Sequence, residues 1–105
     1  MQYTLAKYVV RQDKLRDVKR AIAEFIQEVG AQEPRTLYLV FRDESKTTFS
    51  HLMAFPDDAA QRRHAQARHT CRFVKKLYPH CVGKPEFNEL TLFAASRKQW
   101  PLEPR

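Results

Sequence analysis

The stretch that decides the fold is residues 36–42, which read Thr36-Leu37-Tyr38-Leu39-Val40-Phe41-Arg42. A short run rich in β-branched, aromatic and leucine residues, preceded by Pro34 and followed by Asp43, predicts a β-strand. Successive side chains of a strand point to opposite faces, and here both alternating sets are apolar. Such a strand is typical of a sheet that is covered on both sides.

Around this strand, the periodicity of apolar residues predicts a strand, helix, strand, strand, helix, strand order. The expected ranges are 3–10, 13–30, 36–42, 47–55, 57–78 and 87–95. This order is that of a ferredoxin-like α+β domain with a four-stranded antiparallel sheet. Two helices can cover only one face of such a sheet, so the second apolar face needs another partner. We expect that partner to be a second copy of the chain, which makes a homodimer.

Each expected helix carries signals at its ends. Asp13 is a plausible N-cap for the first helix, Gly30 suits its C-terminus, and Pro34 prevents its continuation. Asp57 and Asp58 suit the positive end of the second helix. The stripe that we expect this second helix to bury comprises Ala60, His64, Ala67, Cys71, Val74 and Tyr78, flanked by Phe73 and Leu77. Its first half is built from small residues, which leaves room for a cavity there.

The composition indicates one globular domain, which we place at residues 1–96, followed by a proline-bearing tail at 97–105 that contains Trp100. The chain has 105 residues, of which 43% are apolar. Its apolar runs are shorter than the ~20 residues of a membrane span, and no signal segment precedes the first strand, so we expect a cytoplasmic protein. The spacing of Cys71 and Cys81 along a helix argues against a mutual disulfide. We expect reduced thiols, one of them in the core.

The net charge of +7 raises the alternative of an RNA-binding module, because the RNA-recognition fold has the same order of elements. No acidic residue occurs between positions 59 and 85, where the basic side chains are Arg62, Arg63, Arg68, Arg72, Lys75, Lys76 and Lys84. A basic helix face is more often simply solvated. The expected third strand, 47–55, has neither glycine nor the aromatic motif with which that fold reads bases. RNA binding is therefore a minor alternative.

Three segments resemble the antibiotic biosynthesis monooxygenase family, within the dimeric α/β-barrel superfamily of ferredoxin-like folds. They are residues 9–14 (Val-Val-Arg-Gln-Asp-Lys), residues 51–60 (His-Leu-Met-Ala-Phe-Pro-Asp-Asp-Ala-Ala) with the following His64, His69 and Phe73, and residues 83–90 (Gly-Lys-Pro-Glu-Phe-Asn-Glu-Leu). The similarity covers roughly residues 3–96. It implies a homodimer in which two sheets pack into a barrel and each subunit holds a cavity between its sheet and its helices.

The resemblance also implies a chemistry. Members of the family oxidise quinols or aromatic phenols with O₂ and without a cofactor, and one branch degrades haem. The haem branch uses an asparagine, a tryptophan and a histidine at positions that correspond here to Tyr8, His64 and Val74. Since the axial histidine is replaced by Val74, the resemblance argues against haem chemistry.

His64, His51 and Tyr8 are the candidate catalytic residues. His64 lies on the small-residue half of the second helix, where a neutral imidazole could take a proton from a bound phenol. The alternative for His64 is a buried histidine bonded to a backbone carbonyl. His51 joins it only if the Phe49, Met53 and Phe55 face of the third strand looks at the helices. The resemblance places Tyr8 at the position of the haem branch's pocket-facing asparagine, which implies that it could donate a hydrogen bond to a substrate oxygen, although a tyrosine in a buried strand is more often structural.

We expect neither a metal nor a nucleotide cofactor. His64 and His69 are five residues apart, a rotation of about 140° on one helix, so they should not share a face. The chain has only two glycines, which disfavours a phosphate loop. The sequence thus predicts a cofactor-independent monooxygenase acting on an aromatic phenol or quinol. The alternative is a small-molecule-binding or stress-response dimer of the same fold without chemistry.

Overall fold

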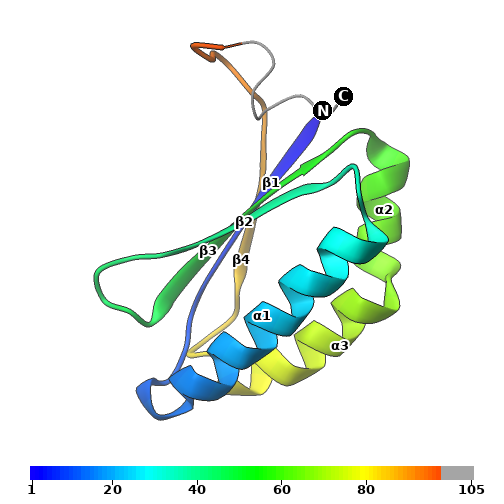
Figure 1. The fold of residues 1–105 in the computed structure, drawn as a ribbon. Coiled ribbons are helices and arrows are strands. Elements are labelled where there is room, and N and C mark those ends of the chain that lie inside the picture. The colour runs from blue at the N-terminus through cyan, green and yellow to red at the C-terminus, as the bar shows by residue number, and fades with distance from the viewer. Residues whose placement is uncertain (98–105) are drawn as a thin grey trace.

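Four strands form one antiparallel sheet in the order β2-β3-β1-β4, and the helices lie on one side of it (Figure 1). The computed structural model describes residues 1–97. Its elements are β1 (Gln2–Val9), α1 (Leu15–Gln32), β2 (Leu37–Arg42), β3 (Thr48–Phe55), α2 (Asp58–Gln66), α3 (Arg68–Leu77) and β4 (Glu86–Leu90), with short 3-10 helices η1 (Gln12–Lys14) and η2 (Tyr78–His80). The expected ferredoxin-like fold is confirmed.

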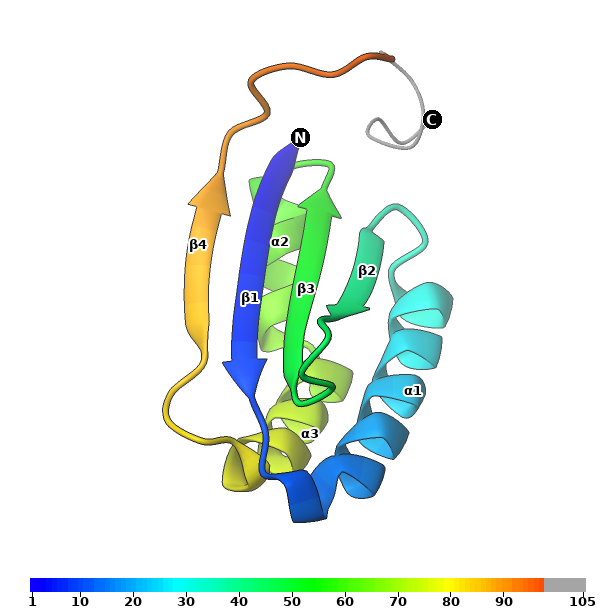
Figure 2. The same cartoon turned by 90° about the vertical axis from the view of Figure 1, so that its left-hand side faces the viewer.

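The order of the strands in the sheet follows from how the chain connects them. β2 and β3 form a hairpin, and the two long connections bring β1 to the middle of the sheet between β3 and β4 (Figure 2). In the turn of the hairpin, the Asp43 carboxylate accepts a hydrogen bond from the backbone N–H of Ser45 at 2.8 Å, and Lys46 adopts a positive φ of 69°. This side chain to backbone bond is the typical stabilisation of a short turn.

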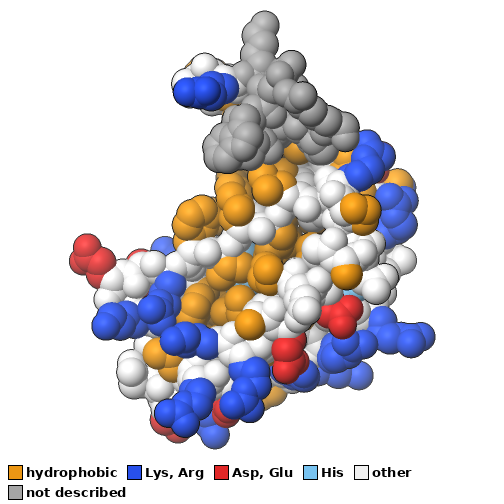
Figure 3. All heavy atoms as spheres, viewed as in Figure 1, with side chains coloured by type: hydrophobic (Ala, Val, Ile, Leu, Met, Phe, Trp, Pro, Cys, Tyr) orange, Lys and Arg blue, Asp and Glu red, His pale blue; other side chains and the backbone are white. Residues whose placement is uncertain are grey.

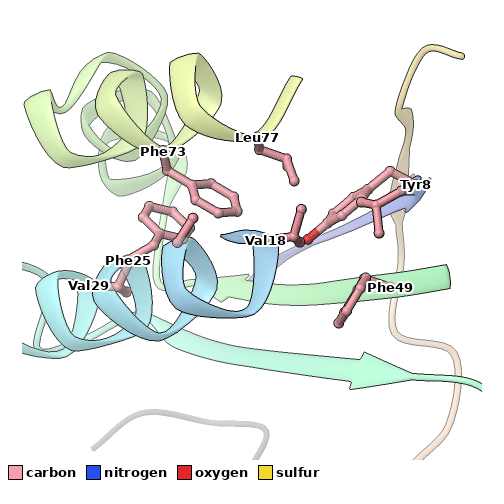
Figure 4. Close-up of a cluster of buried hydrophobic side chains, with 9 residues drawn as sticks. Tyr8, Val18, Phe25, Val29, Phe49, Phe73 and Leu77 are labelled. Carbon is pink, nitrogen blue, oxygen red and sulfur yellow. The ribbon is translucent and has the colours of Figure 1, made fainter. Parts of the chain in front are cut away.

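The core lies between the sheet and the helices. On α1, the residues Val18, Phe25 and Val29 are buried as the periodicity predicts. Figure 4 shows Phe25 of α1 lying face to face with Phe73 of α3, with ring centroids 4.3 Å apart. Because the interior is closely packed, this ring pair fixes the spacing of the two helices above the sheet.

The second helix is not continuous, and the prediction of one helix over 57–78 was wrong. α2 ends at Gln66, Ala67 is extended (φ −64°, ψ 147°), and α3 begins at Arg68. The break shifts the helical phase, so α3 buries His69, Phe73 and Leu77. Neither proline nor glycine signals the break, and we attribute it to the tertiary contacts described below.

The break also explains the outcome for the cysteines. Cys71, which was expected on the buried stripe, is exposed, whereas Cys81 is half-buried and packs against the core. Both are free thiols as predicted. Asp13 is not an N-cap, since it lies in η1 and α1 begins two residues later. β4 ends at Leu90 and not at residue 95. The tail that contains Trp100 lies outside the described residues, apart from Arg97.

The other face of the sheet has no helix over it and carries a row of leucines. Leu39, Leu52 and Leu5 stand opposite one another across β2, β3 and β1, and each is half-buried. Figure 3 shows hydrophobic side chains gathered where Figure 1 draws the sheet, with Lys and Arg beside them. The expectation of a second apolar face is thus confirmed for the single chain.

None of the helices in residues 1–97 is long and apolar enough to cross a membrane.

Candidate functional site

A cavity of about 440 Å³ lies between the helix-covered face of the sheet and the helices. Its wall includes all three residues that the sequence singled out, Tyr8, His51 and His64. Much of the remaining wall is apolar, with contributions from Ala6, Phe25, Met53, Phe55, Phe73 and Leu77. A concave, mostly apolar site with a few converging polar groups is the usual form of a small-molecule site.

The alternation of the strands places these side chains. In β1, the even-numbered residues Thr4, Ala6 and Tyr8 line the cavity, and in β3 the odd-numbered residues from His51 to Phe55 do so. The question of which face His51 occupies is thereby answered, since it looks at the helices. Ala6 stands beside His51 in the register, and its small side chain leaves space in front of the imidazole.

His51 is held between two tyrosines. Its Nε2 lies 2.7 Å from the Tyr8 hydroxyl and its Nδ1 lies 2.8 Å from the Tyr38 hydroxyl. The side chain is only 1% exposed, and this burial lowers the pKa of His51 to about 4. Burial likewise raises the pKa of both tyrosines, so both hydroxyls keep their protons near neutral pH.

A neutral imidazole has one N–H donor and one acceptor nitrogen. One tyrosine must therefore donate to His51 while the other accepts from it. The accepting tyrosine keeps its own O–H proton for a ligand, and the donating tyrosine keeps its lone pairs. The Tyr8, His51 and Tyr38 triad therefore offers the cavity one hydrogen-bond donor and one acceptor, and a change of tautomer would exchange them.

His64 belongs to a second polar cluster, which is built on Glu33. The Glu33 carboxylate lies 2.7 Å from His64 Nδ1 and 2.5 Å from His69 Nε2. Burial is the largest influence and raises the pKa of Glu33, but the hydrogen bonds from His64 and His69 oppose it, and the net pKa is lowered. The ionised carboxylate only accepts hydrogen bonds, so both histidines present an N–H to it.

The proton on Nδ1 determines what His64 can do. In the neutral ring, Nε2 is then the unprotonated nitrogen, and no group within residues 1–97 is hydrogen-bonded to it. A histidine whose Nδ1–H is held by a carboxylate is the usual arrangement of a general base. Because His64 also lines the cavity, it can accept a proton from a bound ligand.

A third polar group closes the β4 side of the cavity. Gln61 Nε2 donates to Thr4 Oγ1 at 3.2 Å and to Glu89 Oε1 at 3.1 Å. These three side chains come from α2, β1 and β4 and all line the cavity. They add polar atoms to the wall of the cavity.

Sequence reasoning missed Tyr38, Glu33 and His69. Tyr38 could have been found, because it has the same alternation as Val40, which stands opposite His51. Glu33 carried no signal, since it lies in the link after α1. The expectation that His64 and His69 diverge was wrong, because the break at Ala67 turns both toward Glu33. The donor atoms of Glu33, His64 and His69 lie within 4.8 Å of one another, so these residues could hold a metal ion.

Comparison with known proteins supports the fold. No protein-family model matches the sequence, and no curated protein matches it either. Solved structures do match. The crystal structure of an antibiotic biosynthesis monooxygenase superposes with a TM-score of 0.82 at 22% identity, over 90% of this chain and 100% of that one. The chain has the fold of that protein.

Two further structures agree. A "putative antibiotic biosynthesis monooxygenase" of Caulobacter crescentus matches with a TM-score of 0.82 and 18% identity, over 89% of this chain and 90% of that one. A conserved protein of Methanosarcina mazei matches with a TM-score of 0.77 and 18% identity, over 85% of this chain and 89% of that one. At these identities the likeness establishes a common fold.

Proposed function

We propose that this protein belongs to the antibiotic biosynthesis monooxygenase family and oxidises an aromatic phenol or quinol with O₂, without a cofactor. The observation that carries the proposal is that Tyr8, His51 and His64 share one aromatic-walled cavity. The cavity volume of about 440 Å³ suits a small aromatic molecule. Two solved structures with this fold are named as an antibiotic biosynthesis monooxygenase and a "putative" one, which supports a monooxygenase activity.

In the proposed reaction, His64 Nε2 takes the phenolic proton and the ionised Glu33 stabilises the imidazolium that forms. The electron-rich anion passes an electron to O₂. One oxygen atom then enters the substrate and the other leaves as water, with the substrate supplying the electrons. Tyr8 and Tyr38, positioned by His51, hydrogen-bond the substrate oxygens, and the apolar wall excludes bulk water from the anion.

We further propose that the active form is a homodimer. The row of Leu39, Leu52 and Leu5 crosses the centre of the face that no helix covers. A closed two-fold pair of such faces would bury these leucines on both copies and complete a barrel. Burial of apolar area at about 25 cal/mol per Å² favours this pairing.

Oxygen consumption tests the proposal. Purified protein is incubated with a panel of hydroquinones and polyphenols, and O₂ uptake and products are measured for wild type and His64→Gln. We expect uptake by wild type, and a loss of about 10²-fold or more in the variant because the base is gone. His80→Gln, which changes a histidine outside the cavity, is the matched control. If ligands bind but emerge unchanged after aerobic incubation, the protein is a binding module instead.

A further inference from the structure

Glu33, His64 and His69 form a compact cluster of one carboxylate and two imidazoles. Their side chains are 11%, 8% and 9% exposed, so all three are almost fully buried. Their nearest donor atoms lie within 4.8 Å of one another. Burying three titratable groups together is costly unless each is hydrogen-bonded or coordinates a metal.

We propose that this cluster is a binding site for a divalent transition-metal ion of the Zn²⁺ or Co²⁺ class. Two imidazole nitrogens and one carboxylate oxygen form a donor set that such ions prefer, and this set leaves coordination positions open. Both nitrogens now lie close to Glu33 Oε2, His64 Nδ1 at 2.7 Å and His69 Nε2 at 2.5 Å. A metal about 2.1 Å from each requires them to separate only slightly, which small ring tilts can provide.

The backbone is arranged to bring these donors together. Glu33 is the residue that follows α1, His64 lies in the last turn of α2, and His69 lies in the first turn of α3. Five residues on a continuous helix would turn the two histidines apart by about 140°. The break at Ala67 therefore creates the convergence, at the cost of interrupting the helix.

Packing holds the His64 ring in place. The aromatic rings of Phe25, Tyr38 and Phe55 lie around it, with centroids 5.9, 5.6 and 5.2 Å from its own. Phe25 also lies beside His69, with a centroid separation of 6.1 Å. A ligand set fixed by surrounding side chains loses little conformational entropy when the metal binds.

The cluster has access to solvent on the side away from the cavity. Glu33 and His69 line a cleft of about 720 Å³, together with Arg35, Arg63, Arg68 and Arg72. These arginines oppose a bare cation, but they favour an anion or hydroxide as the remaining ligand of the metal. The metal would thus enter from this cleft and not through the cavity.

Metal binding would also change the part that His64 plays, a consequence that rests on the proposed function. With a metal on Nδ1, the imidazole carries its proton on Nε2. His64 would then present a donor to the cavity in place of an acceptor. The metal-free protein is accordingly the form with an available base.

Metal binding without any substrate tests the site separately from the oxygenase proposal. Metal-free wild type is titrated with Zn²⁺ by calorimetry and with Co²⁺ by visible absorption. We expect one ion per chain, and an affinity lower by about tenfold or more in His69→Gln and in Glu33→Gln. His80→Gln and Cys71→Ser are the controls, because they remove another imidazole and the exposed thiol, and should bind as wild type does.

Imidazole ¹⁵N signals of the wild type give a readout that does not depend on any variant folding. Zn²⁺ should shift the Nδ1 signal of His64 and the Nε2 signal of His69 and leave those of His51 unchanged. Absence of a stoichiometric ion, equal affinity in His69→Gln and wild type, or a Zn²⁺ response confined to other histidines would each overturn the proposal. None of these results depends on whether the protein consumes O₂.

Discussion

The hydroxyl of Tyr8 lies 2.7 Å from Nε2 of His51, although the two residues are 43 positions apart in the chain. The pairing of β1 with β3 brings them together, and Tyr38 of β2 completes the set at 2.8 Å from Nδ1. Three adjacent strands each contribute one polar group to the same cavity. The imidazole is fully satisfied, so it positions the two tyrosines rather than acting as a base.

Replacing His51 by phenylalanine should destabilise the protein. An aromatic ring is kept, but two buried tyrosine hydroxyls lose their partner, and a buried unsatisfied group costs about 1–3 kcal/mol of unfolding free energy. Urea denaturation measures this loss. Ser50→Ala, next to it on the opposite face of β3, should change stability by less than about 0.5 kcal/mol. Equal stability of the two variants would contradict the role of His51 as the centre of the network.

The stability of the protein should fall as the pH is lowered from 6.5 toward 4. The pKa of His51 is about 4 in the folded chain against 6.5 when exposed, so between these values the unfolded state binds a proton that the folded state does not. The contribution of the neutral His51 to the free energy of unfolding is fully present above pH 6.5. Its loss by pH 4 amounts to about 3 kcal/mol.

Urea midpoints at a series of pH values measure this dependence. His51→Phe should show a shallower decline between pH 6.5 and 4 than wild type, because the titrating group is absent. Parallel curves for the two proteins would show that His51 is not the responsible group. The other titrating side chains contribute equally to both curves, so their effect cancels in the comparison.

Replacing Glu33 by glutamine should lower stability by about 1–3 kcal/mol, because two buried imidazoles lose their charged acceptor. The matched control is Glu28→Gln, a partly exposed glutamate of α1 whose carboxylate lies 3.8 Å from the Arg72 guanidinium. An exposed pair of this kind contributes about 0–1 kcal/mol. Thermal unfolding at neutral pH compares the two. A Glu33 variant as stable as the Glu28 variant would mean that the carboxylate does not hold α2 and α3 to α1.

Replacing Leu52 by lysine should convert the proposed homodimer to a monomer. The substitution places a charge in the middle of the leucine row, where the partner copy would leave it unpaired. Sedimentation equilibrium at micromolar concentration gives the mass. Lys19→Glu, an exposed change on α1, should leave the mass unchanged. A monomeric wild type would refute the dimer directly.

Replacing Tyr38 by phenylalanine should weaken binding of a phenolic ligand about 3- to 10-fold, the effect of one hydrogen bond. Tyr78→Phe is the control, since Tyr78 also lines the cavity but is not bonded to His51. Fluorescence or calorimetric titration measures both. The same affinity in both variants would place the ligand away from the Tyr8, His51 and Tyr38 triad.

Local patterns predicted much of this protein. Alternation in 36–42 and 47–55 and the stripe on α1 predicted the strands, the first helix and the sheet with two apolar faces, because each depends on near neighbours in the chain. They also singled out His51 and His64, whereas Tyr8 was singled out by the family resemblance. The side of the sheet on which His51 lies could not be predicted, because both faces of β3 are partly apolar. Only the position of the helices distinguishes the two faces.

Local sequence patterns did not predict the break at Ala67 or the bonds that Glu33 makes to the two histidines. No local residue interrupts the helix, so the sequence reads as one continuous segment with Cys71 inside and His69 outside. The carboxylate after α1 compensates for the interrupted helix by bonding histidines on both sides of it. The order, type and facing of most elements were thus determined by short-range side-chain chemistry in the sequence itself. The convergence of Glu33, His64 and His69 was decided only by the packing of α1 against α2 and α3, because its energy comes from bonds between residues more than 30 positions apart.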